Sequence, residues 1–97
     1  MRYTVVLQPE ETGYSVTCPA VSGAVSQGET LDEALLGIVE AVEGLLESLL
    51  EDGETPPAET LAMIAEEITI VLAERAEDGL PLTIETKEIE VRLPAPV

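Results

Sequence analysis

The strongest constraint on the fold lies between Thr30 and Asp52, where apolar side chains recur every three or four residues. At about 100° per residue, this period places them on one face of a helix. Thr30 and Glu33 fit a capping box at its start, and Gly53 follows its last turn, where a left-handed cap is expected. The pattern therefore predicts a long amphipathic helix over 30–52. Its apolar face comprises Leu31, Leu35, Ile38, Val39, Val42, Leu45, Leu46 and Leu49.

Three short segments before this helix alternate apolar and polar residues with the period of a strand. They cover residues 3–8, 14–18 and 23–27, and a polar loop of hairpin length joins the first two. The segments therefore predict an antiparallel meander, in which Cys18 is a small buried side chain. The expected core contains Tyr3, Val5, Leu7, Tyr14, Val16, Leu35, Val39, Val42, Leu46 and Leu49.

The second half of the chain carries weaker signals. Thr55 and Pro56 suit the N-cap and first position of an additional helix over 56–78, which Gly79 would end. The β-branched run 68–71 leaves a strand there as the alternative. The expected apolar stripe of this helix is Leu61, Ile64, Ala65, Ile68 and Leu72.

The last segment of the chain reads as a strand with a break in its pattern. Leu82 and Ile84 alternate in one phase, whereas Ile89, Val91 and Leu93 alternate in the other. A shift by one residue would expose the wrong face, so the pattern predicts a bulge over 85–88.

Together these elements predict an α+β fold of order β-β-β-α-(α)-β, in one domain over residues 1–97. A small antiparallel sheet would be covered by one main amphipathic helix, and 97 residues leave no room for a second core. Unpaired sheet edges are a liability, so a homo-oligomer is expected. One cysteine suits a reducing cytoplasm, and no stretch approaches the ~20 apolar residues of a membrane span.

The charge of the chain excludes several functional classes. It has 4 Lys or Arg, 20 Asp or Glu and no His, for a net charge of −16. Such a chain lacks the basic surface needed for nucleic acid or for an anionic membrane. Without His it also lacks the commonest general base and metal ligand. We therefore predict no catalytic, metal-binding or cofactor-binding residue and no enzyme activity; a hydrolase would need two close carboxylates in a pocket.

The acidic residues gather on the long helix. Ten of the 20 lie within residues 29–59, which hold no Lys or Arg. Like charges one turn apart each cost roughly 0.2–0.5 kcal/mol, and nothing in the segment offsets this cost. Either the buried face outweighs the cost and the acids are simply solvated, or a basic partner covers them. The candidate partner-binding residues are Glu33, Glu40, Glu43, Glu47 and Glu51.

Two glycines are expected on this same acidic face of the helix. Gly37 and Gly44 lie seven residues apart, and each lowers helix stability by about 1 kcal/mol relative to alanine. They are either tolerated substitutions or positions where another backbone approaches closely.

One motif runs through the first half of the chain. Gly13-Tyr14 opens a hydrophobic strand, Pro19 to Gly23 follows it, and Ser26-Gln27-Gly28-Glu29-Thr30 leads into the helix with Glu40-Ala41. This pattern resembles the HicB-like antitoxin family over residues 1–53. The resemblance implies a partial ribonuclease-H-like fold without its catalytic carboxylates. It also implies a non-enzymatic protein that neutralises a small basic toxin of the HicA type, an mRNA-cleaving enzyme.

The resemblance does not extend to a C-terminal DNA-binding element. After Glu59 the chain offers Arg75, Lys87 and Arg92 against eight acids, and a recognition helix needs a basic surface. The partners expected are thus a basic protein toxin and further copies of the chain, with no nucleic acid and no membrane. The alternative is an orphan, self-assembling scaffold protein of the same fold without a toxin.

Overall fold

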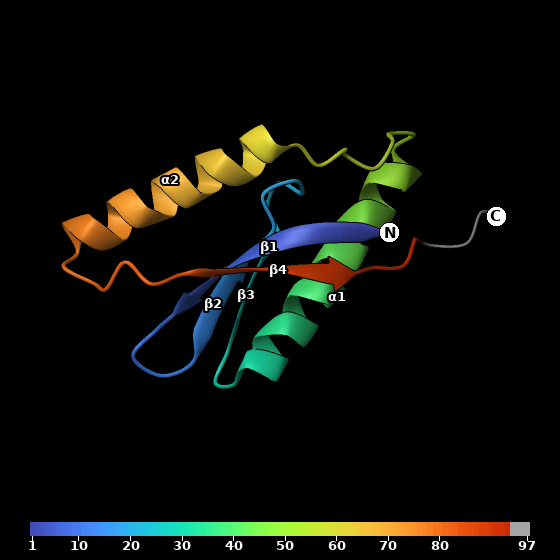
Figure 1. Cartoon of the computed structure of the whole chain (residues 1–97). Helices are drawn as coiled ribbons and strands as arrows, with labels where there is room; N and C mark the ends of the chain where they lie inside the picture. Colours follow the sequence, from blue (N-terminus) through green and yellow to red (C-terminus); the bar gives the residue numbers. More distant parts are fainter. Residues whose placement is uncertain (94–97) are drawn as a thin grey trace.

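The computed structural model describes residues 1–93, which form a four-stranded antiparallel sheet with a helix on each face (Figure 1). Residues 94–97 of the predicted domain lie outside the described residues. The strand order is β3-β2-β1-β4. The α+β class and the order β-β-β-α-α-β confirm the sequence prediction. The elements are β1 (Arg2–Pro9), β2 (Tyr14–Thr17), β3 (Val25–Gly28), α1 (Leu31–Glu51), α2 (Leu61–Glu77) and β4 (Glu85–Glu90).

Helix α1 packs on one face of the sheet through the predicted apolar stripe. Ala34, Ile38, Val42 and Leu46 are fully buried. They join one core cluster with alternate residues of β1 and with Val16 of β2. The stripe predicted from the sequence is therefore confirmed. Its edge residues, together with Tyr14, are partly buried against the cluster; they are Leu31, Leu35, Val39, Leu45 and Leu49.

The start of α1 is fixed by side chains that satisfy its free backbone amides. The Thr30 hydroxyl accepts a hydrogen bond from the Glu33 N–H at 3.1 Å, as the capping box predicts. The Glu33 carboxylate accepts from the N–H of Glu29 at 3.0 Å, rather than from Thr30 itself. The Glu33 side chain of this capping box therefore bonds to the residue before the N-cap, whereas in the usual form it bonds to the N-cap residue itself.

Both helices end in the same type of left-handed turn. Gly53 has φ +78°, its N–H donates to the Leu50 carbonyl, and the N–H of Glu54 donates to the Leu49 carbonyl at 2.9 Å. This pair of bonds is a Schellman motif, and Gly79 and Leu80 repeat it after α2. The two predicted helix stops are confirmed.

Helix α2 begins later than predicted. Thr60, not Thr55, is its N-cap, and the Thr60 hydroxyl accepts from the Met63 N–H at 3.2 Å. A residue that precedes proline disfavours the helical conformation, so Pro57 prevents Pro56 from starting a helix. The helical prediction for the region is confirmed from Leu61 onward, and the strand alternative over 68–71 is wrong.

The inward face of α2 differs from the predicted stripe. Val71 and Arg75 are buried. Of the predicted stripe, Ile64, Ile68 and Leu72 are half-buried, whereas Leu61 is 85% exposed and Ala65 is exposed. The reason lies in the sheet, because successive residues of a strand point to opposite faces. The residues of β1 that alternate with the core positions include Thr4 and Gln8, so α2 packs on a partly polar surface.

Hydrogen bonds of Glu59, Glu67 and Arg75 hold α2 and its approach segment to this surface. The N–H and hydroxyl of Thr4 both donate to the Glu59 carboxylate, and the Thr17 hydroxyl donates to Glu67 at 3.2 Å. The guanidinium of Arg75 donates to the Gln8 side chain and to the Pro9 carbonyl. Val6 is the fully buried apolar residue of β1 that alternates with the core cluster. Polar contacts therefore carry much of the attachment of α2.

Strand β4 pairs with β1 without interruption. The register runs from Arg2 opposite Glu90 to Leu7 opposite Glu85, so the bulge predicted over 85–88 is wrong. The phase change has another cause, since residues 82–84 precede the strand and belong to the connection from α2. The third strand likewise begins at Val25 rather than at residue 23.

The two glycines of α1 have different surroundings. A Cβ added at Gly37 would lie 2.1 Å from the Ser26 Oγ, whereas a Cβ at Gly44 would meet nothing within 4 Å. Gly37 therefore permits the close approach of α1 to β3, within this protein. Gly44 is exposed and needs no such explanation.

Alanine at Gly44 is expected to raise the free energy of unfolding by about 1 kcal/mol, the ordinary gain inside a helix. The matched change Gly37→Ala should gain less, because the Ser26 hydroxyl must move away. Urea denaturation of both variants measures the difference. Equal gains would contradict the assigned role of Gly37.

Candidate functional site

The five predicted partner-binding carboxylates divide into two groups. Glu33 caps the start of α1, and Glu43 accepts a hydrogen bond from the Arg92 N–H at 2.7 Å. Both therefore serve the fold. Glu40, Glu47 and Glu51 are exposed, and within residues 1–93 their carboxylates make no ion pair. The free acidic surface of α1 thus centres on these three residues.

The ion pairs of the described residues lie away from that surface. Within residues 1–93, the ion pairs join the N-terminus and Arg2 to Glu88 and Glu90 across the β1–β4 ladder. Arg75 is buried beneath α2. Arg92 lies beside α1, where its backbone N–H bonds to Glu43, but within residues 1–93 no Lys or Arg side chain forms an ion pair with a carboxylate of α1. The acidic face is therefore available to a basic partner.

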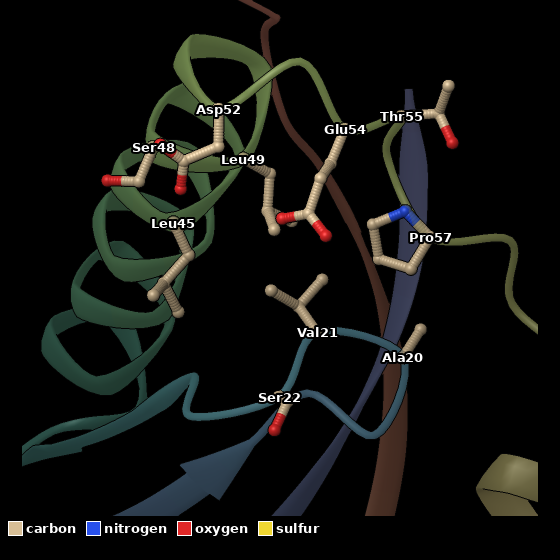
Figure 2. A pocket seen from close by; sticks show the side chains of 10 residues that line it. All are labelled: Ala20, Val21, Ser22, Leu45, Ser48, Leu49, Asp52, Glu54, Thr55 and Pro57. Atoms are coloured by element: carbon tan, nitrogen blue, oxygen red, sulfur yellow. The ribbon is translucent and has the colours of Figure 1, made fainter.

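A groove lies beside the C-terminal end of α1 (Figure 2). Its volume is about 380 Å³, and it runs between the last turns of α1, the 20–22 turn and the segment 54–57. Leu45, Leu49, Val21 and the ring of Pro57 give it apolar walls. The Glu54 carboxylate points into it, between Leu49 and Pro57 and above Val21. The other lining residues are Ala20, Ser22, Ser48, Asp52 and Thr55.

Two local structures hold the walls of this groove in place. The Schellman motif after α1 turns the chain back, so that Glu54 lies over Leu49. The Tyr3 hydroxyl donates to the Pro57 carbonyl at 2.7 Å and ties the segment 54–57 to β1. Burial, followed by the nearby Cys18 and Glu59, raises the pKa of the Tyr3 hydroxyl, which therefore keeps its proton for this bond.

Sequence reasoning missed Glu54, although a signal was present. In a Schellman motif the residue after the left-handed glycine usually makes an apolar contact with the helix. After α2 this position holds Leu80, but after α1 it holds Glu54. A carboxylate at a position that favours an apolar residue is the feature that marks the groove.

Cys18 is the small buried side chain that the sequence predicts. It is buried in the core cluster, and burial raises the pKa of its thiol. The thiolate, which is the nucleophilic form, is therefore disfavoured.

A second hollow, of about 620 Å³, gathers carboxylates near the start of α1. Glu10, Glu29 and Glu33 line it together with Tyr14 and Gly28. The Glu10 carboxylate accepts from the Ser15 hydroxyl at 2.8 Å, and that of Glu33 caps the helix. These two carboxylates thus support the β1–β2 hairpin and the start of α1.

Two kinds of structural feature are absent from residues 1–93. No group of three or more Cys, Asp or Glu side chains is placed to hold a metal ion. No helix within the same range has both the length and the apolar composition needed to cross a membrane.

Known proteins share both the sequence pattern and this fold. The profile of the family described as a HicB-like antitoxin of bacterial toxin–antitoxin systems matches residues 3–70. The UPF0150 protein Ta0767 of Thermoplasma acidophilum is 42% identical over 71 residues, which cover 72% of this chain and 97% of that protein. Antitoxin HicB 1 of Photorhabdus laumondii is 43% identical over 58 residues, 59% of this chain and 37% of that one.

Solved structures agree with the sequence comparisons. The crystal structure of the Burkholderia pseudomallei antitoxin HicB aligns with a TM-score of 0.66 and 25% identity, covering 100% of this chain and 72% of that one. A chain of the HicA3 and HicB3 toxin–antitoxin complex aligns with a TM-score of 0.61 at 17% identity, which shows the shared fold; the coverage is 95% of this chain and 99% of that one. With its sequence profile, motif and fold in agreement, this chain belongs to the HicB-like antitoxin family of bacterial toxin–antitoxin systems.

Proposed function

We propose that this chain is a non-enzymatic antitoxin that binds and neutralises a small basic toxin of the HicA type in the cytoplasm. Membership of the HicB-like antitoxin family carries the proposal. One relative is Antitoxin HicB 1 of Photorhabdus laumondii, and one structural neighbour belongs to a toxin–antitoxin complex. The single domain over residues 1–97 would be the binding unit.

The charge of α1 supports a basic partner. Glu40, Glu47 and Glu51 are exposed and form no ion pair within residues 1–93, while Glu33 and Glu43 lie on the same acidic helix. A positively charged partner would be steered toward such a surface and would relieve the repulsion along the helix. We therefore assign these five residues to the toxin-binding face, with the three free ones making most of the contact.

Charge reversal on α1 tests this proposal. The triple variant Glu40→Lys, Glu47→Lys, Glu51→Lys should bind a small basic protein of the HicA type, sought in the reading frame beside this gene, at least tenfold more weakly than the parent chain does. Its binding should also depend less on salt, because the steering charge has been reversed. Titration calorimetry at two salt concentrations measures both, and rescue of growth on coexpression reports neutralisation.

A control variant distinguishes the effect of reversing charges on this face from the effect of changing the net charge. Glu66→Lys, Glu74→Lys, Glu77→Lys changes the net charge equally but on the exposed side of α2. This control should bind nearly as well as the parent chain. Equal losses in the two triple variants, or no loss in either, would overturn the binding face on α1. Absence of any complex with the basic protein would overturn the antitoxin role itself.

The sheet favours self-association as a second candidate role. β3 and β4 are its edge strands, and their outer backbone groups face no further strand within residues 1–93. Such edges offer sites for strand pairing between copies. Light scattering across micromolar concentrations tests the expected homo-oligomer; an oligomer that forms without any toxin complex would support the scaffold function instead.

A further inference from the structure

We propose that the groove beside the C-terminal end of α1 receives a lysine or arginine side chain from the basic protein partner. This inference rests on the proposed antitoxin function and names a contact that the acidic face alone does not supply. The groove combines apolar walls with a carboxylate, and these match the two parts of a long cationic side chain.

The apolar walls fit the aliphatic part of such a side chain. Leu45 and Leu49 from α1 face Val21 and Pro57 from the two flanking segments (Figure 2). Lysine and arginine bury their methylene stems along apolar surface while keeping the charged head near water. The groove opens to the protein surface, so a side chain of a docked protein can enter it.

The electrostatics at the end of the groove fit the cationic head. The Glu54 carboxylate points into it, and Asp52 lies at its rim. The C-terminus of α1 adds partial negative charge from its last carbonyl groups, where a cation is favoured. The last turn of α1 holds no basic residue of its own. A cation brought by a partner would therefore meet three sources of negative potential at once.

The comparison between the two helix ends strengthens this assignment. After α2 the corresponding position is Leu80, an apolar residue at the position where Schellman motifs favour one. After α1 it is Glu54, which gives up that apolar contact and leaves a carboxylate over Leu49. Within residues 1–93 no Lys or Arg forms an ion pair with Glu54. The chain therefore keeps a carboxylate where its own folding does not require one.

A small probe tests the groove without any toxin. The ¹⁵N-labelled protein is titrated with N-acetyl-arginine methylamide and N-acetyl-lysine methylamide, and amide shifts are followed by NMR. The amides of Val21, Leu49 and Glu54 should shift saturably. N-acetyl-citrulline methylamide, which keeps the shape but lacks the charge, should bind at least fivefold more weakly. Guanidinium chloride at equal concentration, which lacks the stem, should give no saturable shift.

Substitutions at Glu54 provide the decisive readout. Glu54→Leu restores the usual apolar contact, so the variant should melt at a higher temperature while its affinity for the arginine probe falls at least fivefold. Glu77→Leu is the control, because it removes one exposed carboxylate from the last helical position of α2, outside the groove lining. It should keep most of the probe affinity. Equal probe binding by Glu54→Leu and the parent chain, or equal losses in both variants, would overturn the proposal.

The toxin provides a separate test of the same contact. Glu54→Leu should weaken capture of the basic protein several-fold while leaving the Glu40, Glu47 and Glu51 surface intact. If Glu54→Leu captured the basic protein as well as the parent chain does, the proposed role of the groove would be overturned, but the antitoxin function would not be contradicted. If no basic protein is captured, the partner assignment fails together with the antitoxin function, even where the arginine probe binds.

Discussion

Replacing Arg75 with methionine is expected to release α2 from the sheet and to lower the free energy of unfolding by about 2–4 kcal/mol. Arg75 is only 3% exposed, and its guanidinium donates to the Pro81 carbonyl at 2.6 Å and to the Pro9 carbonyl at 3.2 Å. A fully buried acceptor left without its donor costs about 1–3 kcal/mol, and these two part-buried bonds fall toward the lower end of that range. Methionine preserves the length and packing of the side chain but supplies no donor.

A second variant of Arg75 and a control at Arg92 show which property of the Arg75 side chain stabilises the fold. Arg75→Lys keeps the charge, but one ammonium group cannot reproduce the planar set of donors, so about half of the loss should remain. Arg92→Met removes an exposed arginine and should change stability by less than about 0.5 kcal/mol. Urea denaturation gives these values, and hydrogen exchange shows where protection is lost.

Hydrogen exchange should report a local event. The amides of α2 should lose protection in Arg75→Met, while those of α1 keep theirs, because α1 and the core cluster lie on the other face of the sheet. A fully protected α2 in a variant of unchanged stability would contradict this prediction. It would mean that apolar packing compensates for the lost donors, as happens when some buried charges are replaced.

The second large effect is expected at Gly13, which closes the β1–β2 hairpin. Its φ is +94°, and a Cβ there would lie 2.2 Å from the Gly28 carbonyl oxygen and 2.9 Å from the Glu29 Cα. Alanine must therefore both adopt a left-handed backbone and displace the turn that leads into α1. We expect Gly13→Ala to lower the free energy of unfolding by about 1–3 kcal/mol more than left-handed backbone strain alone.

Gly23→Ala is the comparison that isolates the additional loss of stability expected of Gly13→Ala. Its φ is +88°, but an added Cβ would meet nothing within 4 Å. Gly23→Ala should therefore show only the left-handed penalty, about 1–2 kcal/mol. Thermal or urea denaturation of the two variants isolates the steric part. If both lose the same stability, the close approach between the two turns has no energetic weight.

This close approach also explains part of the motif that first suggested the family. Gly13 lies in the Gly-Tyr pair and Gly28 in the Gln-Gly-Glu-Thr run, and the structure brings the two turns together. A Cβ at Gly28 would in turn lie 2.5 Å from the Ala34 backbone nitrogen. These motif residues therefore build the junction between hairpin and helix, and they belong to the fold rather than to a binding surface.

The features predicted well from the sequence are those that depend on neighbours in the chain. The stripe, N-cap and C-terminal glycine of α1 all act within a few residues of one another, and each was found where expected. The inward face of α2 could not be found by the same reasoning. It includes Glu67 and Arg75, because the sheet face beneath it is partly polar. The predicted apolar stripe is half-buried at Ile64, Ile68 and Leu72, but it also included Leu61 and Ala65, which are exposed.

The candidate site also combines features that local spacing predicts with features that depend on long-range contacts. Glu40, Glu47 and Glu51 were predicted on the outward side of α1 from periodicity alone, and they are exposed. The engagement of Glu43 by the Arg92 N–H depends on a segment 49 residues away, which local spacing does not reveal. The groove depends on the hydrogen bond from Tyr3 to Pro57, a contact across 54 residues. Long-range contacts thus decide which acids are free.

The pairing of β1 with β4 has a consequence for how the protein is made. β1 lies inside the sheet only because residues 85–90 cover its outer edge, and Met1 and Val91 exchange two backbone hydrogen bonds at its end. During synthesis the segment that carries α1 and its acidic face leaves the ribosome long before this strand. Until residue 90 has emerged, the nascent chain presents a bare strand edge, and its sheet is still unfinished.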